Sequence, residues 1–187
     1  MYFLVQLINF VLDTYLFLLL VRLLLQKLGA GWQNPMTQTI VKVTDPVVKP
    51  LRRFCPGVAG FDLAIVVAMI AFEWLETLLL LKIKVGVMPG LLGSLVVSLI
   101  YLGNKVISLY FWGTIVVVAM SWLPMIRHNP LAAIVSIIVE PLMKLGRRFV
   151  PLIGGIDLSA IPILLLLKII ENYLLYPILL HGYRLAY

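Results

Sequence analysis

Two stretches of 30 residues decide the fold of this chain: NPMTQTIVKVTDPVVKPLRRFCPGVAGFDL at residues 34–63 and NPLAAIVSIIVEPLMKLGRRFVPLIGGIDL at residues 129–158. They align without a gap at an offset of 95 residues and are identical at 11 of 30 positions. The same offset pairs Glu76 with Glu171. A register kept over this length indicates an internal repeat, so we predict two tandem copies of one unit.

The residues around these stretches are strongly apolar. Of the 187 residues, 63% are hydrophobic and only 12% are charged, and the mean hydropathy is +1.09. An ordinary soluble domain has about 25% charged residues, so this chain has too few polar side chains to cover a core. The composition therefore excludes a soluble globular enzyme and a disordered chain, and it predicts a protein whose apolar surface faces lipid.

Four apolar segments are long enough to cross a bilayer, which takes about 20 helical residues. We predict spans at about 2–25, 63–81, 102–126 and 158–180. Residues 85–104 are also uncharged and could form a fifth span. Glycine and proline crowd the first half of that segment and weaken an isolated helix, so we interpret it as an outer turn that leads into the third span. The predicted fold is an all-α polytopic membrane helix bundle.

These spans divide the chain into two repeats. Repeat 1 covers residues 1–82, with a cytoplasmic segment at 26–62 between its spans. A linker on the outer face follows at 83–97. Repeat 2 covers residues 98–187, with a cytoplasmic segment at 127–157. Parallel repeats of this kind are related by an axis along the membrane normal.

The basic residues predict the orientation of the chain. Nine lysines and arginines fall in the two segments between the spans of each repeat, and about four fall on the opposite face. Cytoplasmic loops carry such an excess, so we place both Arg-Arg motifs in the cytoplasm and both termini outside. Five spans would put one of the motifs outside. The net charge of +7 is then directed at anionic lipid headgroups rather than at nucleic acid.

Each loop carries residue types that begin and end helices. Asn is a good N-cap and Pro suits the first helical position, so a short helix should begin in each loop. A later Pro should end that helix, and the carboxylate before it should lie beside the start of a second short helix. A third Pro marks a turn, and the Asp that follows should cap the next span. In chain order these residues are Asn34, Pro35, Asp45, Pro46, Pro56 and Asp62, and then Asn129, Pro130, Glu140, Pro141, Pro151 and Asp157.

The Lys-x-x-Arg-Arg motif of each loop should lie at the end of the second short helix, where cations are favoured. One interpretation is structural: the motif anchors the loops at the cytoplasmic surface. The other is functional: the two clusters form one site for anionic lipid or for a protein partner. The residues concerned are Lys49, Arg52, Arg53, Lys144, Arg147 and Arg148.

The duplicated pattern of Asn-Pro, Asp/Glu-Pro, Lys-x-x-Arg-Arg-Phe-x-Pro and Gly-x-Asp resembles the YggT/YlmG family of small integral membrane proteins. The resemblance extends over nearly the whole chain and includes Asp13, Tyr15 and Arg22 in the first span. The two copies differ inside the motif at Pro50-Leu51 against Leu145-Gly146, and at Ala59 against Gly154. These differences imply that the two copies need not act alike.

The resemblance implies a function but no mechanism. Bacterial members of that family are associated with osmotic or salt-stress tolerance, cation homeostasis, cell division and envelope organisation. Plastid relatives are associated with thylakoid organisation and cytochrome assembly. No catalytic residues are established for the family, so the resemblance implies a non-enzymatic protein of the bacterial inner membrane.

Ionisable residues inside a span are the default candidates for function. At about 1.5 Å of rise per residue, Asp13, Glu73, Glu76 and Glu171 should lie roughly 16–21 Å from the loop face, Lys168 at about 16 Å and Lys105 at about 30 Å. In a structural interpretation, Lys168 pairs with Glu171, Asp13 pairs with Lys105 from a neighbouring helix, and the other side chains reach outward. In a functional interpretation, Glu76 and Glu171 are symmetric carboxylates near the repeat axis that attract a cation or a proton.

The remaining motifs point away from catalysis. No phosphate-binding loop, nucleophile elbow, metalloprotease helix or dinucleotide fingerprint is present. Cys55 is the single cysteine and the two histidines are far apart, so we expect no metal site, no cofactor and no catalytic residue. We therefore expect a scaffold or assembly factor that binds anionic lipids, membrane-protein partners or further copies of itself. The alternative is an oligomeric cation channel or a proton-coupled cation transporter.

Overall fold

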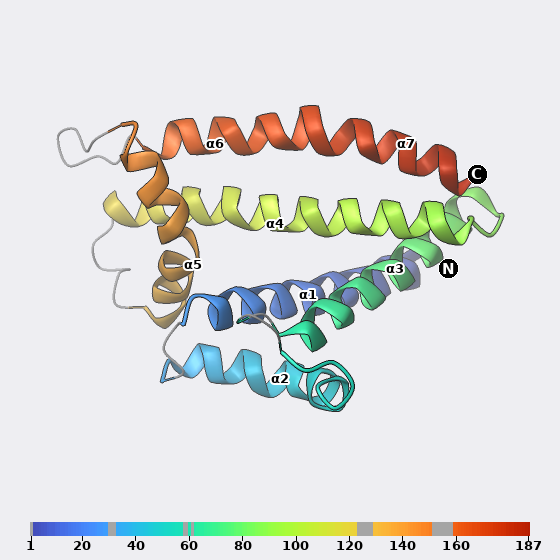
Figure 1. Ribbon diagram of the computed structural model, residues 1–187, viewed down its shortest axis with the longest axis horizontal. Helices are drawn as coiled ribbons and strands as arrows, with labels where there is room; N and C mark the ends of the chain where they lie inside the picture. The colour runs from blue at the N-terminus through green and yellow to red at the C-terminus, as the bar shows by residue number, and fades with distance from the viewer. Residues whose placement is uncertain (1, 30–32, 58–59, 61, 123–128, 151–158) are drawn as a thin grey trace.

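Every regular element in the described part of the chain is a helix (Figure 1). The computed structural model describes residues 2–29, 33–57, 60, 62–122, 129–150 and 159–187. The elements are α1 (Tyr2–Lys27), α2 (Pro35–Leu51), α3 (Leu63–Val85), α4 (Leu91–Trp122), α5 (Pro130–Arg147), α6 (Ala160–Ile169), the π-helical turn η2 (Ile170–Leu175) and α7 (Tyr176–Ala186).

Four helical stretches among the described residues are long and apolar enough to cross a membrane. They are Phe3–Lys27, Leu63–Val85, Leu91–Trp122 and Ala160–Ala186. Each of them overlaps one of the four predicted spans, and the all-α membrane fold is confirmed. Residues 91–104 continue without a break into the rest of α4, so they do not form a separate fifth span. The grouping of these helices into two repeats stays a prediction.

The turn between α3 and α4 is shorter than the predicted linker at 83–97. α3 ends at Val85, and its C-cap residue Gly86 adopts φ 79° and donates its backbone N–H to the Lys82 carbonyl at 2.8 Å. α4 begins at Leu91, so only residues 86–90 lie outside both helices. Gly93 lies inside α4. Any larger residue would clash at this position, because a Cβ there would come within 2.2 Å of the Ala186 backbone nitrogen. The glycine that weakens an isolated helix here allows α4 and α7 to touch.

The last span contains a π-helical turn, η2. The backbone N–H of Tyr176 bonds to the carbonyl of Glu171, five residues back. Pro177 follows directly. Proline has no N–H to donate and its ring clashes with the carbonyl four residues earlier, so a wider turn before it relieves the clash. The span therefore continues through η2 to Ala186 instead of ending near residue 180.

The prediction that Pro46 and Pro141 end short helices is wrong. α2 and α5 are continuous helices with these prolines inside them. A proline within a helix costs about 3 kcal/mol, but the residues on both sides of each proline are packed against the bundle. Thr44 and Val48 flank Pro46, and Val139 and Met143 flank Pro141, and all four are fully buried. Tertiary packing therefore outweighs the local preference.

The core lies where α2 and α5 meet the long helices. One cluster joins α1, α2 and α3 around Leu19, Val48 and Ile65, and α5 joins α1 and α6 through two further clusters. Figure 1 shows α5 crossing α4 at the end of the bundle opposite the α3–α4 turn. The start of α1 and the end of α7 lie beside that turn, so both termini share one end of the bundle (Figure 1).

Candidate functional site

The predicted helix caps are present wherever the structure describes them. Asn34 Oδ1 accepts the Met36 backbone N–H at 2.9 Å, and Asn129 Oδ1 accepts that of Leu131 at 2.9 Å. Asp62 Oδ1 accepts the Ala64 N–H at 3.1 Å at the start of α3. Pro35 and Pro130 occupy the first turns of α2 and α5, and Pro56 follows the end of α2. Pro151 and Asp157 lie outside the described residues.

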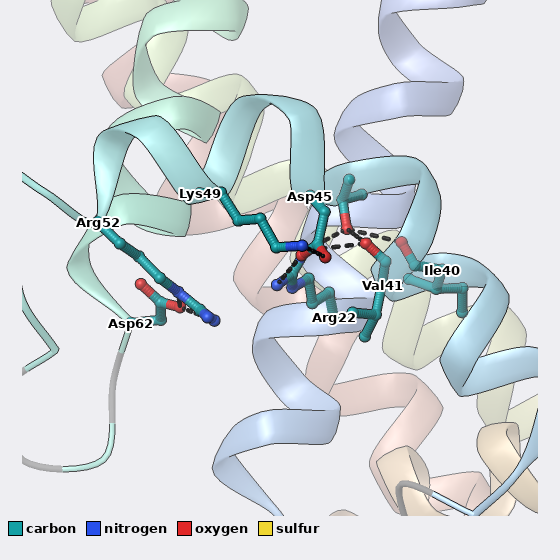
Figure 2. Close-up of polar contacts among 8 residues, drawn as sticks. Arg22, Ile40, Val41, Asp45, Lys49, Arg52 and Asp62 are labelled. Atoms are coloured by element: carbon teal, nitrogen blue, oxygen red, sulfur yellow. Dashed lines mark hydrogen bonds and ion pairs between the residues drawn. The ribbon is translucent and has the colours of Figure 1, made fainter.

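Arg22 of α1 forms the centre of a buried polar cluster with α2 (Figure 2). Its side chain is 2% exposed, and its Nη2 lies 2.9 Å from Asp45 Oδ1. Its Nη1 donates to Thr44 Oγ1 at 2.6 Å and to the Val41 carbonyl at 3.3 Å. Lys49, one turn further along α2, lies 2.9 Å from Asp45 Oδ2. This cluster attaches α2 to the first span, and no spacing in the sequence identifies Arg22 as its centre.

Asp45 therefore forms ion pairs with the side chains of Arg22 and Lys49. It does not cap a second short helix, which corrects that prediction. The hydrogen bond from Lys49, the hydrogen bond from Arg22 and both positive charges lower the pKa of the Asp45 carboxyl below its usual value of 3.8, against the smaller effect of burial. Asp45 is consequently ionised at neutral pH, and the cluster of Asp45, Arg22 and Lys49 has a net charge of +1 by formal charges. The equivalent acid of the second copy, Glu140, pairs with Arg147 at 3.2 Å.

The two arginines of each Arg-Arg motif have different roles. Arg52 binds Asp62, with Nη2 and Nε at 2.6 and 2.7 Å from Asp62 Oδ2, and thus joins the end of α2 to the start of α3 (Figure 2). Arg147 binds Glu140 within α5. Arg53 and Arg148 are exposed. Within the described residues their side chains have no ion pair, so they are the arginines that an external anion can reach.

Arg53 and Arg148 each precede an exposed phenylalanine. Phe54 is 82% exposed and Phe149 is 78% exposed. Lys49 and Lys144, one turn earlier on the same helices, are also exposed. We call these two groups, Lys49/Arg53/Phe54 and Lys144/Arg148/Phe149, the basic–aromatic ends. Such a combination suits the headgroup level of a bilayer, where a ring sits at the hydrocarbon boundary and a cation meets phosphate.

A second set of charges lies inside the spans, around Lys105 of α4. Its Nζ lies 2.8 Å from Asp13 Oδ1 of α1 and 2.7 Å from Glu73 Oε2 of α3. Glu76 Oε2, one turn along α3, lies 3.9 Å from the same nitrogen. Both glutamates are buried. We call these four residues the Lys105 cluster.

The structure agrees with part of the structural interpretation of these charges. The Lys105–Asp13 pair is present, and Lys168 Nζ lies 2.6 Å from Glu171 Oε2. The expectation that Glu73 and Glu76 reach outward is wrong, because both face Lys105. α4 continues outward to Leu91, so Lys105 lies near the middle of this helix, in direct contact with Asp13 of α1.

Glu76 and Glu171 do not meet in one site. Glu76 belongs to the Lys105 cluster, whereas Glu171 lies in η2 and pairs with Lys168, its neighbour on the last span. Lys168 Nζ also lies 4.6 Å from the centre of the Phe111 ring. The two glutamates that the 95-residue offset relates therefore have different partners.

A mostly apolar cavity of about 710 Å³ lies between α1, α2, α4 and α5. Asp13 and Lys105 lie in its wall, together with Asn104 and Ser108. Apart from Thr39, the remaining wall is apolar, as at Phe17 and Ile134. The polar part of the wall thus connects the Lys105 cluster to a space that is open to the surroundings of the protein. Among the described residues, no group of three His, Cys, Asp or Glu side chains is placed to hold a metal ion.

The family model described as CCB3/YggT matches residues 1–83 and 96–178. The two matched stretches begin 95 residues apart, which equals the offset at which residues 34–63 align with residues 129–158. The chain is 37% identical over 158 residues to the uncharacterized protein PA0392 of Pseudomonas aeruginosa, covering 84% of this chain and 80% of that one.

Two further relatives have similar coverage. The chain is 31% identical over 165 residues to the uncharacterized protein YggT of Escherichia coli, covering 88% of this chain and 85% of that one. It is 32% identical over 156 residues to an uncharacterized protein of Vibrio alginolyticus, covering 83% and 84%. No solved structure matches the chain.

Proposed function

The chain belongs to the CCB3/YggT family, and from that premise we propose that it is a non-enzymatic scaffold of the bacterial inner membrane. Its cytoplasmic face gathers anionic lipids and membrane-protein partners. In this way it supports osmotic and ion homeostasis, or the organisation of the envelope and of division.

The observation that carries this proposal is the pair of basic–aromatic ends. Just after the last turn of each amphipathic helix, α2 and α5, an exposed arginine precedes a phenylalanine that is about four-fifths exposed, at 82% for Phe54 and 78% for Phe149. A soluble protein rarely leaves such rings in water, and at a membrane surface the ring and the cation have matching surroundings. Two such ends give the protein two points at which it can hold anionic lipid.

The ion pairs behind these ends support a scaffold role because they hold the ends in place. Arg52 is bound to Asp62, so the last turn of α2 is attached to α3. Arg22 and Asp45 attach the middle of α2 to α1. A side chain mounted on a fixed helix loses less conformational freedom on binding than one on a mobile loop.

The single cysteine offers a direct test, because Cys55 follows Phe54 and is partly exposed. We would attach a fluorophore to Cys55 in the purified protein and reconstitute it in bilayers. Spin-labelled phosphatidylglycerol should quench it more strongly than spin-labelled phosphatidylcholine. Each basic residue near an anionic surface contributes about 1 kcal/mol, so Arg53→Gln should reduce the relative preference for phosphatidylglycerol about fivefold.

Two matched controls locate the effect. Arg148→Gln removes the equivalent charge at the other basic–aromatic end and should leave quenching at Cys55 unchanged. Lys82→Gln with Lys84→Gln removes two exposed charges from the opposite end of α3 and should also leave it unchanged. Equal quenching by the two lipids in the wild type, or an equal loss in all variants, would contradict the proposal.

A second candidate function is favoured by the Lys105 cluster. Four ionisable side chains inside the spans, next to an open cavity, suit an oligomeric cation channel or a proton-coupled cation transporter. The test is flux of K⁺, Na⁺ or H⁺ into liposomes that contain the purified protein. Flux that Glu76→Gln abolishes in a protein that still folds would replace the scaffold proposal, whereas no flux for any of the three ions would eliminate the transporter.

A further inference from the structure

Lys105 has no N–H group left for Glu76. An ammonium group has three donors, and Glu73 Oε1, Glu73 Oε2 and Asp13 Oδ1 lie 2.9, 2.7 and 2.8 Å from Nζ. Glu76 Oε2 lies 3.9 Å from the same nitrogen, which is too far for a hydrogen bond. This oxygen is buried and has no hydrogen-bond partner among the described residues.

The charges around Lys105 do not balance. If all three acids were ionised, one ammonium group would face three carboxylates, and the cluster would have a net charge of −2 by formal charges. Asp13 is half exposed at the cavity, but the Glu76 side chain is only 5% exposed. A buried carboxylate without a hydrogen-bond donor is far more costly than a neutral carboxyl, so such groups take up a proton instead of staying charged.

A metal cation cannot supply the missing charge at this place. The point between the three carboxylates, where a cation would be bound, is already occupied by the Lys105 ammonium group. No group of three His, Cys, Asp or Glu side chains among the described residues has a metal-binding arrangement. A proton needs only one oxygen, and Glu76 Oε2 is free to accept it.

We infer that Glu76 is a proton-binding site inside the membrane, loaded from the cavity between α1 and α4 through the wall that Asp13 and Lys105 form. Binding is one reversible step: a proton carried by water in the cavity forms an O–H bond on the Glu76 carboxylate, and no bond within the protein breaks. The charged groups that face Glu76 are Lys105 of α4, Asp13 of α1 and Glu73 of its own helix. The inference goes beyond the scaffold proposal and does not rest on it.

Infrared spectroscopy of the reconstituted full chain tests this inference without any measurement of transport. The wild type should show the carbonyl stretch of a protonated carboxylic acid at neutral pH. Labelling glutamate with ¹³C at the side-chain carboxyl should shift this band, whereas the same label in aspartate should not. Glu76→Gln should remove the band, and the matched variant Glu171→Gln, at the residue paired with Lys168, should keep it.

Lys105→Met gives an independent readout if Glu76→Gln does not yield folded protein. Without the ammonium group, Glu73 loses its donor and must also become neutral, so the band should gain about the intensity of one further carboxyl. A band that is missing from the wild type, that shifts with labelled aspartate, or that survives Glu76→Gln would overturn the inference. Unchanged intensity in Lys105→Met would overturn it as well.

Discussion

Replacing Asp45 by asparagine should destabilise the protein far more than the equivalent change in the second copy. Arg22 is 2% exposed and Asp45 is 19% exposed, so Asp45→Asn leaves a buried guanidinium group without its counter-ion. Breaking a fully buried pair costs about 3–5 kcal/mol. Asp45 is partly exposed, and Thr44 and Val41 keep their bonds to Arg22, so we expect a loss of about 2–3 kcal/mol.

The matched control is Glu140→Gln. Glu140 stands at the position of Asp45 in the second stretch, but Val117 stands at the position of Arg22. Its own partner, Arg147, lies 3.2 Å away, and the two side chains are 40% and 35% exposed. A pair this exposed contributes at most about 1 kcal/mol. The two copies of one motif thus differ in their expected contribution to stability.

Thermal unfolding of the purified proteins in detergent, followed by circular dichroism, measures the difference. For a chain of this size about 1 kcal/mol corresponds to roughly 2–4 °C, so Asp45→Asn should lower Tm by roughly 4–12 °C and Glu140→Gln by less than about 4 °C. In Arg22→Met with Asp45→Asn, the loss should be smaller than the sum of the single losses. Equal Tm losses for Asp45→Asn and Glu140→Gln would refute the assignment of Arg22 as the centre of a buried cluster.

The same comparison has a defined pH dependence. The pKa of Asp45 is lowered in the folded protein, so its contribution is fully present above the pKa of the unfolded chain and is lost as the pH falls through the lower, folded value. The Tm gap between the wild type and Asp45→Asn should therefore be constant above about pH 5 and should close below about pH 4. A gap that persists in strong acid would show that the charge of Asp45 is not its cause.

Two further changes test the packing and the last span. Gly93→Ala should lower stability by about 1–3 kcal/mol, because its Cβ would come within 2.2 Å of the Ala186 backbone. The control Gly103→Ala, whose Cβ would have its nearest contact at 3.6 Å, should keep or raise Tm. A larger Tm loss in Gly103→Ala than in Gly93→Ala would contradict the α4–α7 contact. Glu171→Gln should lower stability by about 1 kcal/mol, because it leaves Lys168 unpaired. Adding Lys168→Met should restore part of that loss. No recovery in the double variant would show that the Lys168–Glu171 pair does not stabilise the protein.

The long helices could be predicted because their cause is local. Each span is a run of apolar residues of sufficient length, and each cap is an Asn or Asp directly before a helix. Asn34, Asn129 and Asp62 accordingly form the predicted hydrogen bonds. Such features depend on neighbours in the sequence and on the thickness of a bilayer, so the sequence contains all that is needed to derive them.

The continuous helices α2 and α5 could not be predicted in this way. Pro46 and Pro141 favour a break locally, but Val48 and Val139 are fully buried against other helices. Gly93 is similar: it weakens a helix in isolation and allows close packing against α7. In each case a contact with a distant segment outweighs the local preference, and the hydropathy of the chain does not reveal which segments will be in contact.

The polar clusters could not be predicted, because they depend on how each helix is rotated about its own axis. Arg22 is visible in the sequence as a basic residue in a span, yet its pairing with Asp45 follows only from the way α2 packs on α1. In the sequence Glu73 and Glu76 have no evident common partner, but in the structure α3 directs both side chains toward Lys105. The 95-residue offset between Glu76 and Glu171 therefore does not predict their surroundings, since the two residues have different neighbours.

The most direct experiment asks whether the two basic–aromatic ends face the same side of the membrane. In a Cys55→Ser background, single cysteines at Phe54→Cys, Phe149→Cys and Met88→Cys are treated with a membrane-impermeant maleimide in intact spheroplasts and again after permeabilisation. We predict that Met88→Cys, in the α3–α4 turn, reacts in intact spheroplasts, whereas Phe54→Cys and Phe149→Cys react only after permeabilisation. Labelling of Phe54→Cys and Phe149→Cys on opposite faces, or of both from outside, would contradict a scaffold with one cytoplasmic lipid-binding face.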